Sequence, residues 1–220
     1  MRVLGFDPSM TNFGWCLHDT DIPVGAPGRL VESGRFQTSA RTLFIDRYTD
    51  QRESVRSLLD RLGSSHGVYR VGVESVVFGE LYTAGLYGLH LYNCEALKLC
   101  KADVVFFSPG QLKALARYTL DRPISWKMMK PDMVEATKRD AGLRGNLNHN
   151  EADAYWAAYA AGRFWSFMDG VITKEDLNPV EAKQFTEIHK DQRCVKAGLT
   201  VNKGIMFQED SRFFCWSKEF

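Results

Sequence analysis

The chain has 220 residues, of which 45% are hydrophobic and 25% are charged, and its formal net charge is +1. This length suits one domain with an appendage, and the ordinary composition excludes a disordered or fibrous protein. The near-neutral charge does not decide whether the chain binds nucleic acid, because a basic groove can be offset by acidic residues elsewhere.

The predicted elements alternate in a way that indicates an α/β fold. Strands are expected at 2–6, 14–18, 30–37, 68–77 and 103–108, and helices at 42–62, 81–101, 111–119, 131–141 and 150–167. Three strands in succession predict an antiparallel meander, and the βα units that follow predict parallel strands. We therefore expect a mixed five-stranded sheet with helices on both faces.

The chain divides into a main domain, 1–168, and a C-terminal extension, 169–220. Within the extension, Asn178-Pro179 with Glu181 resembles a capped helix start, and 200–216 is compatible with a small hairpin. The extension either widens a binding surface or covers an edge of the sheet, and the sequence does not choose between these roles.

The apolar segments are too short to cross a membrane. No run approaches the roughly 20 residues of a spanning helix, and no signal-peptide pattern follows Met1-Arg2. The five cysteines form no Cys-x-x-Cys pair, which argues against a zinc site. We expect a soluble, intracellular protein of the cytoplasm, with reduced thiols.

Three carboxylates occupy positions that a sheet would bring together. Asp7 ends the first apolar strand, and Glu74 lies in a β-branched run where burying an ionised side chain would cost several kcal/mol. Asp153 shares one face of its helix with Asn150 and a row of alanines, which allow a close approach to the sheet. Asp7 or Glu74 alone is compatible with an ordinary strand end, and Asp153 with a first-turn acid favoured by the helix dipole, although its place in the alanine row argues against that.

Converging carboxylates repel one another, and divalent cations that prefer oxygen ligands relieve the repulsion. Two Mg²⁺ ions about 4 Å apart suit the hydrolysis of a phosphodiester bond, because they activate a water and stabilise the leaving oxygen. The three acids therefore predict a two-metal site that cuts a nucleic-acid backbone.

Five short motifs, in order, resemble those of RuvC-type Holliday junction resolvases. The segments are Gly5-Phe6-Asp7-Pro8-Ser9, Val73-Glu74-Ser75, Ser108-Pro109-Gly110-Gln111-Leu112-Lys113, Lys130-Pro131-Asp132 and Asn150-Glu151-Ala152-Asp153-Ala154. The resemblance covers residues 1 to about 165. It implies an RNase H-like homodimer that acts in DNA recombination and repair, binds four-way junctions and nicks two opposed strands symmetrically with Mg²⁺, for which Mn²⁺ would substitute.

The resemblance also implies roles for individual residues. Asp7, Glu74 and Asp153 correspond to metal ligands, and Lys113 and Lys130 to lysines that contact phosphates near the cut. The family's fourth acid falls on Asn150 here, so the fourth ligand is Asn150 by register or else the neighbouring Glu151 or His149. The family's base-stacking aromatic falls on Val77, and Phe78 beside it is the candidate for that role.

Basic residues gather in the middle of the chain, with ten lysines and arginines against five acids between residues 98 and 144. Such an excess suits phosphate contacts by Lys113, Arg117, Lys127 and Lys130, although solvated helix faces would give the same count. The helix at 81–100 is apolar almost all round. It is either a dimer contact or a helix enclosed within one subunit.

Two other functions remain open. The same fold could cut other branched DNA or RNA–DNA hybrids, or the chain could bind junctions without cleaving them, since Asn150 replaces an acid. An actin-like ATPase shares the Asp-containing hairpin opening, but it requires two such domains and phosphate loops that a chain of this length lacks.

Overall fold

The computed structural model describes residues 1–75, 83–186, 206–209 and 212–215. The strands are β1 (Arg2–Asp7), β2 (Asn12–Asp19), β3 (Leu30–Gln37), β4 (Arg70–Glu74), β5 (Asp103–Phe107), β6 (Met206–Glu209) and β7 (Arg212–Cys215). The helices are α1 (Phe44–His66), α2 (Thr83–Leu99), α3 (Pro109–Thr119), α4 (Lys130–Ala141), α5 (His149–Met168), the 3₁₀ turn η1 (Lys174–Asp176) and α6 (Pro179–Thr186). The predicted order of elements is confirmed.

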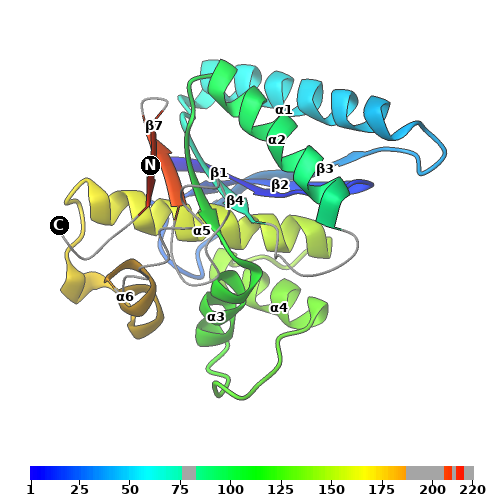
Figure 1. Cartoon of the computed structure of the whole chain (residues 1–220). Coiled ribbons are helices and arrows are strands. Elements are labelled where there is room, and N and C mark those ends of the chain that lie inside the picture. The colour runs from blue at the N-terminus through cyan, green and yellow to red at the C-terminus, as the bar shows by residue number, and fades with distance from the viewer. Residues whose placement is uncertain (76–82, 187–205, 210–211, 216–220) are drawn as a thin grey trace.

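One mixed sheet runs through the molecule in the order β3-β2-β1-β4-β5-β6-β7 (Figure 1). Strands β1 to β3 form the expected antiparallel meander, and β1, β4 and β5 are parallel. The five-stranded core sheet is thus confirmed. The hairpin expected in the extension adds β6 and β7, and because β6 pairs antiparallel with β5, it covers that edge of the sheet.

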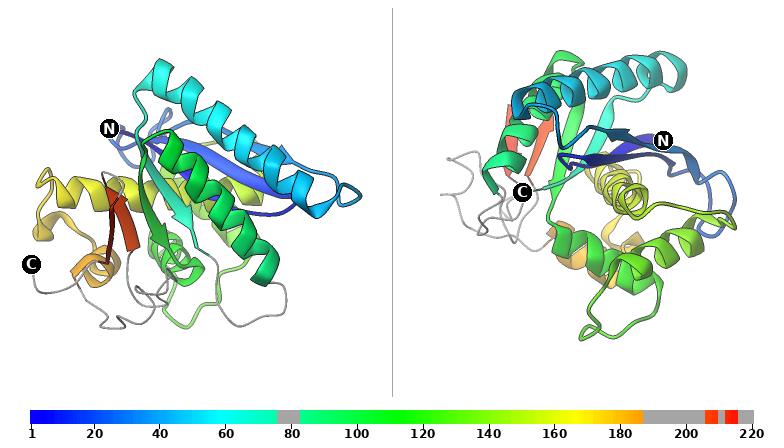
Figure 2. Two further views of the ribbon diagram at one scale, coloured as in Figure 1. Left: turned by 45° about the horizontal axis from the view of Figure 1, so that its top comes forward. Right: turned by 90° about the vertical axis from the view of Figure 1, so that its right-hand side faces the viewer.

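Helices cover both faces of the sheet (Figures 1 and 2). Helices α1 and α2 pack together over one face, while α5 lies against the other face across β1, β2 and β4. Helices α3 and α4 pack on α5 in turn, so α5 is enclosed on most sides and buries twelve of its residues. Within the described residues, no helix has both the length and the apolar character needed to span a bilayer.

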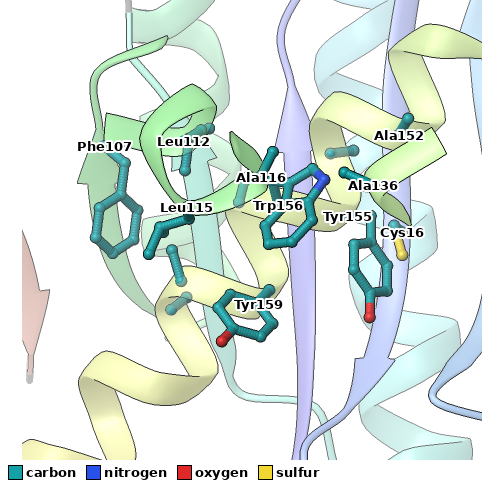
Figure 3. Packing of buried hydrophobic residues seen from close by; sticks show 14 of the residues in the cluster. Cys16, Phe107, Leu112, Leu115, Ala116, Ala136, Ala152, Tyr155, Trp156 and Tyr159 are labelled. Carbon is teal, nitrogen blue, oxygen red and sulfur yellow. The ribbon is translucent and has the colours of Figure 1, made fainter. Parts of the chain in front are cut away.

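The core on the α5 side combines large and very small side chains. Figure 3 shows Trp156 and Tyr159 of α5 among Leu112, Leu115 and Ala116 of α3. Helix α3 begins sharply because Ser108 accepts a hydrogen bond from the Gln111 backbone N–H at 3.3 Å, part of a capping box that fixes its first turn.

The described part of the extension is anchored to α5. Glu181 is buried, and its carboxylate accepts hydrogen bonds from the Tyr159 hydroxyl at 2.8 Å and the Arg163 Nε at 2.9 Å. The Phe185 and Phe164 rings meet edge to face with centroids 5.8 Å apart. Residues 169–186 therefore pack as part of the same body as the main domain.

Candidate active site

Asp7 and Glu74 lie side by side at the carboxyl ends of two neighbouring central strands. Strands β1 and β4 are parallel, and their register pairs Gly5 with Gly72 and Phe6 with Val73, so each acid is the next residue along its strand. Side chains alternate along a strand, and Phe6 and Val73 belong to the core on the α1 side. Asp7 and Glu74 therefore face the opposite side, where α5 lies.

Helix α5 approaches the sheet so closely that only glycine fits beneath it. A Cβ built on Gly5 would lie 1.9 Å from the Ala154 carbonyl oxygen, and one on Gly14 would lie 2.2 Å from that of Asn150. Gly72 meets the Ala157 carbonyl oxygen in the same way, at 2.1 Å. The predicted alanine face is thus the contact face, and these glycines on β2, β1 and β4 are its counterpart in the sheet.

This approach brings Asp153 to the two strand-end acids. A cavity of about 570 Å³ is lined by Asp7, Glu74, Asp153 and Asn150. Its other walls contain three lysines, Lys113 of α3, Lys127 of the connection before α4 and Lys130 of α4, together with Met128, Met129 and Met133. The predicted acids and three of the predicted DNA-contacting residues therefore share one site.

The surroundings of the cavity raise the pKa values of all three acids. Burial raises the pKa of Asp7 well above its usual range, and the negative charges of Glu74 and Asp153 add to this effect. Burial, followed by the charge of Asp153, raises the pKa of Glu74 to about 8. Burial raises the pKa of Asp153 to about 6, against the opposing effect of Lys113 and Lys130. Three ionised carboxylates in this space require a cationic counterpart.

The three candidates for the fourth ligand lie in different surroundings. Asn150 lines the cavity, and its amide nitrogen donates to the Asn12 carbonyl oxygen at 2.9 Å. Glu151 instead accepts a hydrogen bond from Ser33 Oγ at 2.8 Å and forms an ion pair with Arg35 at 3.4 Å. His149 Nε2 lies 2.9 Å from Lys130 Nζ, and neither His149 nor Glu151 lines the cavity.

The oxygen atoms of the cavity are the kind that bind a hard cation, although the described side chains are not gathered into a complete coordination shell. Carboxylate and amide oxygens are the ligands that Mg²⁺ prefers. Within the part of the chain that the structure describes, however, no three His, Cys, Asp or Glu side chains form a ready-made metal cluster.

The remaining predicted contact residues are Arg117 and Phe78. Arg117 is not part of the cavity wall, and its Nη1 donates to the backbone carbonyl oxygens of Ile124 at 2.8 Å and Trp126 at 3.4 Å. Phe78 lies outside the described residues. The sequence interpretation missed the methionines of the wall, for which the run Lys127-Met128-Met129-Lys130 between two predicted contact lysines was the available signal.

Solved structures of other proteins share this arrangement of strands and helices. Thermus thermophilus RuvC superposes with a TM-score of 0.59 at 20% sequence identity, covering 77% of this chain and 97% of RuvC. The chain has the RuvC fold. T. thermophilus RuvC in complex with a Holliday junction substrate also gives a TM-score of 0.59, at 18% identity, over 76% of this chain and 96% of that one.

The RuvC fold is the RNase H-like architecture expected from the sequence. A yeast mitochondrial Holliday junction resolvase aligns more loosely, with a TM-score of 0.46 at 14% identity over 78% of this chain and 84% of the resolvase. No protein-family model and no curated protein sequence matches the chain. At these identities, the shared feature is the fold.

Proposed function

We propose that this protein is a metal-dependent DNA endonuclease that resolves four-way junctions by symmetric nicking. One observation carries the proposal: Asp7, Glu74 and Asp153, far apart in the sequence, line one cavity beside three lysines. The RuvC fold supports the substrate class, because one of the similar structures is a RuvC bound to a Holliday junction.

Asp7, Glu74, Asp153 and Asn150 would hold two Mg²⁺ ions, for which Mn²⁺ would substitute. These ions would activate a water and stabilise the departing 3′ oxygen during phosphodiester hydrolysis. The raised pKa values of the three acids, caused first by burial, support this assignment, since a bound cation would favour their ionised forms. Asn150 is proposed as the fourth ligand because it lines the cavity, unlike Glu151 and His149.

The lysines would hold the DNA backbone. Lys113 and Lys130 are exposed to solvent and form part of the cavity wall, Lys113 from the second turn of α3 and Lys130 from the first residue of α4. From these positions they would contact phosphates beside the scissile bond and stabilise negative charge that develops during cleavage. Lys127 extends this basic wall along the connection before α4.

Symmetric nicking requires two sites on one substrate, so we propose that the active form is a homodimer. Helix α2 is the candidate contact. It packs on α1 through one side, while Leu99 near its end stays 61% exposed. A two-fold dimer would present two cavities to opposed strands of a junction. Sedimentation velocity of the full chain tests this directly, with a dimer as the expected species.

The deciding experiment compares Glu74→Gln with Glu135→Gln. Both changes replace a carboxyl group by an amide of nearly the same shape, but Glu135 is an exposed residue of α4 outside the cavity. Glu74→Gln is expected to abolish nicking of a four-way junction in Mg²⁺ while leaving junction affinity intact, and Glu135→Gln should cut like the wild type. EDTA should stop the reaction, and Mn²⁺ should restore it.

The substrate panel separates the alternatives. A four-way junction, a fork, an RNA–DNA hybrid and a linear duplex should be tested side by side. Paired symmetric nicks in the junction alone support resolution, whereas unpaired nicking of every branched substrate would identify a broader nuclease. Tight junction binding without any cleavage would identify a binding protein, the alternative that Asn150 in place of an acid raises. Crystals soaked in Mn²⁺ should hold two ions in the cavity.

A further inference from the structure

The connection between α3 and α4, residues 120–129, forms part of the cavity wall and carries unusual side chains. We call it the α3–α4 loop. Its residues Lys127, Met128 and Met129 line the cavity, and Figure 1 shows the loop projecting away from the sheet beneath α3 and α4. Ile124 is 87% exposed, Met129 54% and Trp126 42%. Single exposed apolar residues are ordinary, but here three lie within six residues beside the candidate active site.

The loop is held in place by hydrogen bonds and by one buried anchor. Arg117 of α3 donates to the carbonyl oxygens of Ile124 and Trp126, and the Trp126 backbone N–H donates to the Pro123 carbonyl oxygen at 2.9 Å. Met128 is buried in the core. These contacts fix the backbone on both sides of Trp126, so its indole is presented to solvent by a structured turn.

One cationic group lies on the indole, and a second adjoins Trp126 in the sequence. The Arg122 guanidinium lies over the Trp126 ring, 4.9 Å from its centroid, and Lys127 follows directly in the sequence. Aromatic residues, Met and Arg are enriched in protein–protein interfaces, whereas Lys is depleted there. An aromatic ring among lysines and arginines is typical of surfaces that bind unpaired nucleic acid. Lys127 and the lysine-lined cavity beside the loop therefore favour DNA over a protein partner.

We infer that Trp126 stacks on an unpaired nucleobase at the branch point of DNA held in the cavity. This inference rests on the proposed function and adds a residue that selects the substrate. Within a continuous duplex, both faces of each base are covered by its neighbours, so the indole has no face to stack on. A branch point exposes such faces, and stacking on an aromatic ring tolerates any base. Trp126 thus favours branched DNA over linear duplex.

The test measures binding in EDTA, where no cleavage occurs. The probes are a four-way junction with 2-aminopurine at the branch point and a linear duplex of the same sequence. Trp126→Ala should weaken junction binding about five- to a hundredfold and duplex binding less than about twofold. It should also abolish the change in 2-aminopurine fluorescence. Trp126→Phe, which keeps an aromatic face, should retain most of the affinity and the signal.

Tyr118→Ala is the matched control, because Tyr118 is a similarly exposed aromatic residue, at 45%, that belongs to α3 and not to the α3–α4 loop. It should bind both probes like the wild type. Equal losses on junction and duplex with Trp126→Ala, or no loss on either, would overturn the stacking role. A change in the association of two copies of the chain without a change in DNA binding would assign the loop to protein contact and would also overturn it.

Failure of the proposed function has a different signature. In that case the wild-type protein neither nicks the junction nor prefers it to the duplex, which removes both proposals. If only the stacking inference is wrong, the wild type nicks the junction normally and Trp126→Ala binds and nicks it equally well.

Discussion

Replacement of Gly5 by alanine tests the close approach of α5 to the sheet. The new Cβ would lie 1.9 Å from the Ala154 carbonyl oxygen and 2.5 Å from the Ala158 backbone nitrogen, far inside the 3.4 Å at which ordinary contact begins. Both obstacles are backbone atoms, so no change of rotamer relieves the clash. The helix must move by more than about 1 Å, and overpacking of this kind costs about 1–3 kcal/mol or more.

Gly63→Ala provides the control for the same substitution. Gly63 lies within α1, and a Cβ there would meet nothing closer than the Val68 carbonyl oxygen at 3.8 Å. Because alanine has a higher helix propensity than glycine, Gly63→Ala should be neutral or stabilising by up to about 1 kcal/mol.

Urea unfolding of the three proteins measures these free energies. We expect Gly5→Ala to lose about 3 kcal/mol, and any folded fraction to nick DNA poorly because Asp153 moves with α5. A Gly5→Ala protein within about 0.5 kcal/mol of the wild type would show that α5 does not press against β1. The position of Asp153 would then need a cause other than the glycine contacts of α5.

Two further predictions concern stability away from the cavity. Asp140→Asn should cost about 3–5 kcal/mol in urea unfolding because it leaves Arg29, whose Nε lies 2.7 Å from Asp140 in the core, without its counter-charge. Asp121→Asn, which breaks an exposed pair with Arg139, should cost less than about 1 kcal/mol; similar losses for both would contradict the buried pair. Burial and the charge of Arg29 lower the pKa of His18 well below 6.5. As the pH falls through 6.5, His18 therefore becomes protonated in the unfolded chain but stays neutral in the native protein. The contribution of His18 to stability should therefore fall as the pH drops below 6.5, by at most about 1.4 kcal/mol per pH unit. His18→Phe should remove this pH dependence, so the unfolding free energy of the wild type minus that of the variant should fall as the pH drops below 6.5. A difference that stays constant with pH would refute the role of His18.

Local patterns were enough to predict most of the elements and the identity of the acids. Alternation along β1 and β4 places Asp7 and Glu74 on one face, and both acids end strands that the apolar runs already indicate. The alanine row of α5 marks the face that carries Asp153. These inferences succeed because the periods of strand and helix determine which side a residue occupies.

Distances between segments required the folded chain. The position of α5 depends on Gly5, Gly14 and Gly72, which lie on different strands and line up only through the register of the sheet. The pairing of β6 with β5 and the use of Arg117 to hold the α3–α4 loop likewise arise from contacts that no periodicity encodes. A sequence pattern specifies which face of an element a residue occupies and where the element ends. The distances between the side chains of a site depend on strand register and on how closely a helix approaches the sheet, and the packing of the whole core determines both.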